Sequence, residues 1–234
     1  MNGGCALLMD ARSRRIVHAE GDPELVTAPG SVLKPLVLAA LLDSRKLRAD
    51  EQFVCPIELR IGGRNFTCIH PRMAAPITAA TALAYSCNNF VAHVAKRLEP
   101  GELPRYLAHA GLSPSRIRPA QSEEARQLQA LGNGDIAVTP RDLLFAYHLL
   151  AFRPLDAILE GLEGAVAFGT GQNAQVRSVS VAGKTGTASG NAAWFAGFAP
   201  SRGPKVIAVV LTGGRSGGAD AAPIASRLIA EYLR

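Results

Sequence analysis

The chain has 234 residues, and 25 Lys and Arg against 19 Asp and Glu give it a net charge of +6. Its 48% apolar and 6% aromatic residues are typical of a globular protein and exclude a disordered chain. The positive charges are scattered, which argues against a nucleic-acid-binding protein, and no apolar run is long enough to span a bilayer.

The first third of the chain predicts two strands and one buried helix. Residues 3–9 and 15–19 form short apolar runs joined by polar turn residues, which is typical of strands. After Pro29-Gly30, an apolar stretch at helical spacing predicts a buried helix that begins near Ser31. Residues 50–76 have little periodicity, so we expect them to be irregular.

The rest of the chain predicts a helical block, three strands and one last helix. Pro and Gly residues divide the block into helices at about 77–85, 89–98, 102–110, 122–130, 140–151 and 155–168. The predicted strands are 176–187, 192–199 and 205–212, and the final helix lies near 220–233.

This order of elements predicts an α/β fold of the α+β type. An isolated hairpin is only marginally stable, so we expect the strands from both ends of the chain to share one five-stranded antiparallel sheet. We predict a single domain over 1–234, with a sheet subdomain at about 1–30 and 170–234. The helical block, about 31–169, would form a second lobe, and a cleft between lobe and sheet is a common place for a site.

The four cysteines leave two readings open. Cys55 and Cys68 are separated by twelve residues and are the only plausible disulfide pair, but two ordinary buried thiols fit as well. The sequence has no C-x-x-C, and its five histidines are dispersed without an H-E-x-x-H pattern. We therefore expect no metal site and no cofactor.

One short motif combines a hydroxyl with an amine. Ser31 and Lys34 are three residues apart, so they share one face of a helix. A serine hydroxyl becomes a good nucleophile when a neighbouring base removes its proton, and a lysine with a lowered pKa can be that base. The alternative is a serine at the start of a helix followed by a surface lysine.

Two further motifs carry polar side chains. Ser86-Cys87-Asn88 lies between two predicted helices, where a helix N-cap is the plain alternative to a substrate-binding role. Lys184-Thr185-Gly186-Thr187 lies on a predicted strand, where a lysine and hydroxyls suit a carboxylate. A phosphate-binding loop is excluded, because it needs glycine where Ser178 stands and should open a helix.

Taken in this order, Ser-x-x-Lys, Ser-x-Asn and Lys-Thr-Gly resemble the signature of penicillin-binding proteins and serine β-lactamases. The surrounding segments, such as 132–140 and 194–200, resemble penicillin-binding transpeptidases in particular. The resemblance implies a β-lactamase/transpeptidase-like fold. It also implies a DD-transpeptidase that acts on D-alanyl-D-alanine peptidoglycan stem peptides and is acylated by β-lactams.

The same resemblance assigns roles to the motif residues. Ser31 would be the nucleophile, Lys34 the base for acylation, Ser86 the relay that passes a proton to the departing D-alanine, and Asn88 the group that holds the substrate amide. On the strand, Lys184 would raise the local positive potential. The segment Thr185-Gly186-Thr187 would bind the terminal carboxylate, and the backbone N–H groups of Ser31 and Thr187 would form an oxyanion hole.

Several alternatives stay open within this resemblance. Water as acceptor would make the protein a DD-carboxypeptidase, and fast deacylation would make it a β-lactamase, although the chain has no E-x-x-L-N segment of the class A type. A non-catalytic β-lactam sensor domain is the alternative from another class. The implied partners are stem peptides, β-lactams and other cell-wall synthesis proteins, which would bind through regions N-terminal to this chain.

The implied location is extracytoplasmic. This expectation follows from the implied peptidoglycan substrate and not from a targeting signal. The sequence shows no basic-then-apolar leader of the secretory type.

Overall fold

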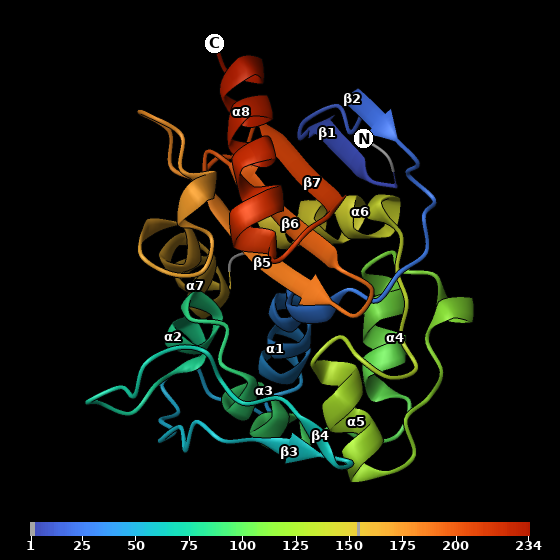
Figure 1. The fold of residues 1–234 in the computed structure, drawn as a ribbon, viewed down its shortest axis with the longest axis vertical. Helices are drawn as coiled ribbons and strands as arrows, with labels where there is room; N and C mark the ends of the chain where they lie inside the picture. The colour runs from blue at the N-terminus through green and yellow to red at the C-terminus, as the bar shows by residue number, and fades with distance from the viewer. Residues whose placement is uncertain (1–2, 154) are drawn as a thin grey trace.

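The computed structural model describes residues 3–153 and 155–234. At its centre is a five-stranded antiparallel sheet with the strand order β2-β1-β7-β6-β5 (Figure 1). Its strands are β1 (Cys5–Asp10), β2 (Ile16–Gly21), β5 (Ala182–Ala188), β6 (Ala192–Ala199) and β7 (Val206–Gly213). The mixed α/β class and the five-stranded antiparallel sheet predicted from the sequence are both confirmed.

The pairing of β1 with β7 joins the two ends of the chain in one sheet. Cys5 lies opposite Leu211, and the pairing continues along the whole of β1. One boundary in this part of the chain was predicted wrongly, because β5 begins at Ala182 and not near residue 176. The intervening residues turn tightly, with an isolated bridge between Val176 and Val179 and a positive φ of 65° at Ser178.

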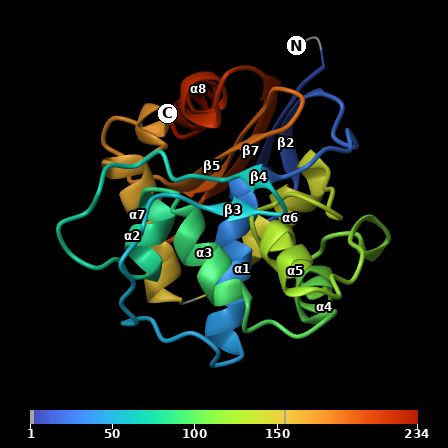
Figure 2. The same cartoon turned by 60° about the horizontal axis from the view of Figure 1, so that its bottom comes forward.

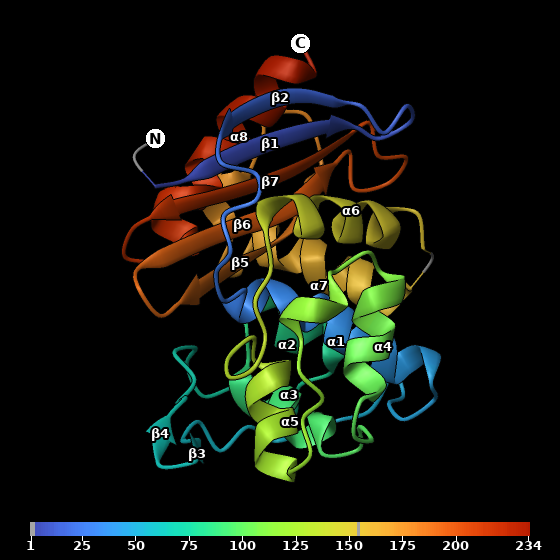
Figure 3. The ribbon, with the colours of Figure 1, turned by 90° about the vertical axis from the view of Figure 1, so that its right-hand side faces the viewer.

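The two faces of the sheet are covered by different helices. Alternate residues of β1 belong to separate apolar clusters, because successive side chains of a strand point to opposite faces. Helix α8 (Ala222–Tyr232) packs on one face and α6 (Pro140–Ala151) on the other, as Figures 1 and 3 show. Helix α7 (Asp156–Ala167) packs beside the edge strand β5. Both α6 and α7, which the sequence assigns to the helical lobe, therefore contact the sheet directly.

The remaining helices form a layer below the sheet (Figures 2 and 3). They are η1 (Gly30–Leu33), α1 (Lys34–Asp43), α2 (Ala79–Ala84), α3 (Asn88–Ala95), α4 (Glu102–His109), η2 (Pro114–Arg116) and α5 (Glu123–Ala130). Every residue of α1 from Lys34 to Leu41 is buried, as expected of a helix that is apolar on all sides. Helix α1 contacts α2, α3, α4 and α7, so Lys34, its first residue, lies on the central helix of this layer.

Short elements complete the fold. Residues 50–76 are irregular as predicted, except for the two-residue strands β3 (Arg60–Ile61) and β4 (Arg64–Asn65). Single turns η3 (Gln172–Ala174) and η4 (Gly217–Ala221) precede β5 and α8. Among the described residues, no helix is both long and apolar enough to cross a membrane.

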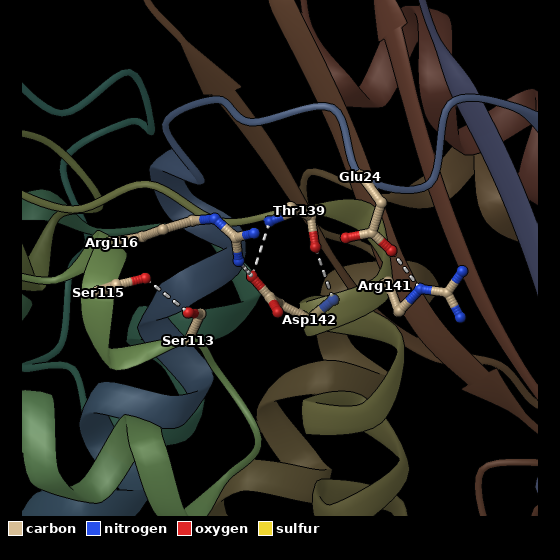
Figure 4. Close-up of polar contacts among 7 residues, drawn as sticks. All are labelled: Glu24, Ser113, Ser115, Arg116, Thr139, Arg141 and Asp142. Atoms are coloured by element: carbon tan, nitrogen blue, oxygen red, sulfur yellow. Dashed lines mark hydrogen bonds and ion pairs between the residues drawn. The ribbon is translucent and has the colours of Figure 1, made fainter.

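Polar contacts fix the start of α6 and the loop that leads to η1. Thr139 caps α6, and its hydroxyl and backbone N–H form a reciprocal pair of hydrogen bonds with Asp142. Asp142 also accepts from Arg116 at 3.0 Å, and Glu24 pairs with Arg141 (Figure 4). These contacts attach the segment before η1 to the helix that supports the sheet.

Candidate active site

The first motif lies where η1 continues into α1. Ser31 is half-buried in the single turn of η1, and Lys34 is the fully buried first residue of α1. Pro35 follows in the first turn of α1, where its missing N–H leaves no helical hydrogen bond unmade. The predicted helical spacing of the two side chains is therefore present, and the lysine is a core residue instead of a surface one.

Glycines allow η1 to lie directly against β5. A Cβ on Gly30, which has a φ of +54°, would approach the carbonyl oxygen of Thr187 to 2.5 Å. A Cβ on Gly186 would lie 2.9 Å from the carbonyl oxygen of Pro29. On the other side of η1, the N–H of Gly30 donates to the carbonyl of Gly132 at 3.1 Å. Backbone therefore meets backbone here, which places the residue before Ser31 beside Thr187.

Lys34 joins the first motif to the second. Its Nζ donates to the carbonyl oxygen of Ser86 at 2.8 Å, to Ser86 Oγ at 3.3 Å and to Asn88 Oδ1 at 2.6 Å. Burial disfavours the ammonium form and lowers the pKa of Lys34 to about 8, and negative charge at Cys87 and Cys68 offsets part of this effect. An amine of this kind exchanges a proton near neutral pH, which an ordinary lysine does not.

The second motif turns sharply before α3. Ser86 has a positive φ of 57°, and the N-cap of α3 is Cys87, whose sulfur accepts from Phe90 N at 3.4 Å. The N-cap alternative for Ser86 and Asn88 is therefore wrong. Both carboxamide ends of Asn88 have protein partners, because Nδ2 donates to the carbonyl of Phe66 at 2.8 Å while Oδ1 accepts from the lysine.

The third motif lies on β5, the edge strand of the sheet. Lys184 is fully buried and donates to the carbonyl of Thr185 at 3.1 Å; burial and the positive charge of Lys34 lower its pKa well below the usual value. Thr185 Oγ1 lies 2.7 Å from Thr170 Oγ1, and Thr187 Oγ1 accepts from Gly217 N at 3.3 Å. The hydroxyls of Thr185 and Thr187 therefore contact the loop between α7 and η3 and the start of η4, respectively.

These elements enclose one cleft of about 360 Å³. Its lining includes six of the eight residues expected from the sequence, namely Ser31, Ser86, Asn88, Thr185, Gly186 and Thr187. Lys34 and Lys184 are buried behind this lining and contact it through the hydrogen bonds above. The structure thus brings together three motifs that are far apart in the sequence.

Sequence reasoning missed four residues of the lining, which are Ile69, Thr170, Ser216 and Gly218. Thr170 lies between two glycines in a segment that looked like a simple turn, and that Gly-Thr-Gly pattern was the available signal. Ile69 gave no signal, because it comes from the irregular segment, yet it is 90% exposed at the cleft. The lining carries hydroxyls, amide groups and two lysines behind it, which suits a substrate with a carboxylate.

Comparisons with known proteins identify the family and the fold. The family model described as "Penicillin binding protein transpeptidase domain" matches residues 4–152 and 154–230. Among curated proteins, none matches this chain. The solved structures that it resembles include a peptidoglycan glycosyltransferase from Burkholderia ambifaria, with a TM-score of 0.85 and 22% identity over 99% of this chain and 88% of the other.

Two more solved structures share the fold. One is the transpeptidase domain of penicillin-binding protein 3 from Burkholderia pseudomallei, with a TM-score of 0.84 and 21% identity over 99% of this chain and 87% of the other. The second is the transpeptidase domain of the FtsI4 D,D-transpeptidase from Legionella pneumophila, with a TM-score of 0.74 and 24% identity over 99% and 89%.

The sheet and its helices form the mixed α/β fold of the transpeptidase domains among these solved structures. Because the family model covers nearly the whole chain, the chain belongs to the penicillin-binding protein transpeptidase domain family. This membership supports a role in peptidoglycan synthesis.

Proposed function

We propose that the chain is a serine DD-transpeptidase that acts on D-alanyl-D-alanine stem peptides of peptidoglycan and is covalently acylated by β-lactams. One observation carries the proposal: Lys34, an amine with a pKa lowered to about 8, is buried one turn after Ser31 and hydrogen-bonded to Ser86 and Asn88. Such an amine is a suitable general base near neutral pH.

In the acylation step, the Oγ–H proton of Ser31 passes to neutral Lys34 while Oγ forms a bond to the penultimate D-alanine carbonyl carbon. When the tetrahedral intermediate collapses, the bond to the terminal D-alanine nitrogen breaks. That nitrogen then receives the proton through Ser86, whose Oγ lies 3.3 Å from Lys34 Nζ. Asn88 holds the base in place and would contact the substrate amide from the edge of the cleft.

Strand β5 would bind the substrate beside the nucleophile. The backbone N–H groups of Ser31 and Thr187 would donate to the developing oxyanion, and each such donor is worth about 3–4 kcal/mol in the transition state. The close contact between η1 and β5 supports this pairing. Thr185 and Thr187 would hold the terminal carboxylate, and Lys184, whose Nζ donates to the carbonyl of Thr185, would raise the positive potential of the strand when it is protonated.

The second half of the reaction transfers the acyl group from Ser31 to an amine of a neighbouring stem peptide and restores the free hydroxyl. Lys34, protonated during acylation and neutral again after the first product leaves, would take the proton from that amine. A substrate in peptidoglycan places the working protein outside the cytoplasmic membrane, in the periplasm or on the outer face of that membrane.

The first test is intact-mass measurement of the full chain after incubation with benzylpenicillin, followed by mapping of the modified peptide. We expect one adduct per chain, on Ser31. The Ser31→Ala variant should stay unmodified, while Ser13→Ala, in the exposed turn between β1 and β2, should react like the parent. Correctly folded protein with an unmodified Ser31, or with an adduct elsewhere, would contradict the proposal.

A second test follows a pentapeptide donor together with an acceptor amine. We expect release of D-alanine and formation of the cross-linked product, and slow loss of the penicillin adduct. Release of D-alanine without a cross-link would indicate a DD-carboxypeptidase, and rapid turnover of a chromogenic cephalosporin would indicate a β-lactamase. Acylation by penicillin without any peptide turnover would indicate a sensor domain.

A further inference from the structure

Behind the cleft lies a cluster of three thiols and one imidazole that the proposed acyl transfer does not use. Its members are Cys55, Cys68 and His70, from the irregular segment before α2, and Cys87 at the start of α3. All four ligand atoms lie within 4.8 Å of one another. Three of the four residues are buried, and all four cysteines of the chain are free thiols.

The spacing of these atoms is that of a tetrahedral metal site. The three sulfur–sulfur distances are 3.8 Å for Cys55–Cys68, 3.7 Å for Cys68–Cys87 and 3.5 Å for Cys87–Cys55. Zinc–sulfur bonds of about 2.3 Å at tetrahedral angles place sulfurs about 3.8 Å apart. The same bonds place a sulfur about 3.5 Å from a ligating nitrogen, and Cys55 Sγ lies 3.7 Å from His70 Nε2.

The imidazole of His70 is oriented as a metal ligand would be. Its Nδ1 lies 2.8 Å from the carbonyl oxygen of Pro71, and because a carbonyl only accepts, Nδ1 carries the proton. Nε2 is then the unprotonated nitrogen, and it is the atom that faces the sulfurs. A backbone carbonyl that fixes the tautomer in this way is a regular outer contact of metal-bound histidines.

Each sulfur accepts a backbone N–H that would stabilise its thiolate. Ile57 N donates to Cys55 Sγ at 3.4 Å, Asn88 N to Cys68 Sγ at 3.3 Å, and Phe90 N to Cys87 Sγ at 3.4 Å. Backbone N–H donors of this kind favour the charged thiolate over the neutral thiol, and the thiolate is the form that binds a metal.

We propose that Cys55, Cys68, His70 and Cys87 bind one Zn²⁺ ion in a closed, structural Cys₃His site. Four protein ligands complete the tetrahedral shell and leave no position for water or substrate, which is the arrangement of structural zinc sites. A metal was not expected here from the sequence, because Cys55 and Cys68 are thirteen positions apart and His70 and Cys87 seventeen, which matches no short zinc motif.

The metal would hold the second catalytic motif in place. Cys87 is the middle residue of Ser86-Cys87-Asn88, and Ser86 has a positive φ, a strained conformation that persists only where the surrounding structure enforces it. Ile69 lies between two ligands and lines the cleft. This consequence for catalysis rests on the proposed function, whereas metal binding itself does not.

The direct test measures the metal. The full chain is produced without chelators, and zinc is quantified by elemental analysis; we expect about one Zn²⁺ per chain. After exchange into Co²⁺, the absorption bands of tetrahedral, thiolate-bound cobalt should appear. His70→Ala should lose most of the metal, whereas His70→Cys, which supplies a fourth thiolate, should retain it.

Two controls separate the metal site from general effects. Cys5→Ala removes a buried thiol on β1 that is outside the cluster, and it should keep full metal content. Ser31→Ala should also keep it, so that a failure of the proposed acyl transfer leaves the metal test intact. Circular dichroism reports whether each variant folds, and a ligand variant that does not fold without metal but folds with added Zn²⁺ also supports the site.

Three results would overturn the proposal. One is folded parent protein that stays free of metal after incubation with Zn²⁺. Another is a Cys55–Cys68 disulfide found by peptide mapping in freshly isolated protein. The third is a folded His70→Ala variant whose metal content and cobalt spectrum equal those of the parent, because the metal would then be bound elsewhere.

Discussion

The lowered pKa of Lys34 predicts how the acylation rate depends on pH. In the proposed mechanism Lys34 accepts the Ser31 proton only when it is neutral, so the rate should follow the neutral fraction of a group with a pKa of about 8. That fraction is about one tenth at pH 7, one half at pH 8 and nine tenths at pH 9. The acylation rate constant should therefore rise about fivefold from pH 7 to 8 and about twofold from pH 8 to 9.

A lysine with its ordinary pKa of 10.5 would behave differently. Its neutral fraction rises about tenfold for each pH unit throughout this range, without a plateau. The shape of the profile therefore distinguishes a buried base from an exposed one, independently of the absolute rate.

The assay follows benzylpenicillin acylation by quenched-flow mass spectrometry between pH 6 and 9.5. Lys34→Met should abolish acylation, while Lys96→Met, which removes an exposed lysine paired with Glu123, should leave both rate and profile unchanged. An acylation rate constant that rises tenfold per pH unit up to pH 9.5, or one that does not change with pH, would refute the reasoning. So would a Lys34→Met variant that acylates like the parent.

Three further substitutions test the supports of the site. Gly132→Ala should lower the unfolding free energy, measured by urea denaturation, by at least about 2 kcal/mol, because the new Cβ would lie 2.1 Å from the carbonyl oxygen of Gly30 in η1. The control Gly190→Ala has a similar φ but open space around the new Cβ, so it should lower the unfolding free energy by only about 1 kcal/mol. Tyr147→Phe leaves the buried carbonyl of Val32 without its 2.8 Å hydrogen bond, so chemical unfolding should show a loss of about 1–2 kcal/mol. Thr187→Val should lower kcat/KM for acylation by about 10- to 100-fold through the lost bond to a carboxylate, and an unchanged value would remove Thr187 from the site.

Most elements of the fold could be predicted from local patterns. Alternation and Gly- or Pro-rich turns indicated all five strands of the main sheet, and helical spacing indicated α1 to α8 to within a few residues. The main error, the start of β5, arose because 176–181 has a strand-like composition but turns at Ser178. A positive φ at a serine cannot be predicted from the sequence, since glycine is the residue that usually indicates this conformation.

The division of the chain into a sheet subdomain and a helical subdomain at residues 30 and 170 stays a prediction. Helices α6 and α7 lie within the predicted helical part and yet contact the sheet. A change from strand to helix along the sequence marks a change of element, but it does not say which layer the helix covers.

The sequence by itself determined which residues are candidates for the chemistry, because Ser31, Lys34 and the Lys184 strand follow local spacings that hold in any helix or strand. Only the tertiary structure decided that Lys34 is wholly buried, that Ser86 and Asn88 bond to it, and that Cys55, Cys68, His70 and Cys87 converge. The physical reason is that desolvation and metal-like geometry depend on atoms brought together from distant segments. Spacing along the chain determines which side chains share a face of one helix or strand, whereas only packing determines which atoms surround those side chains.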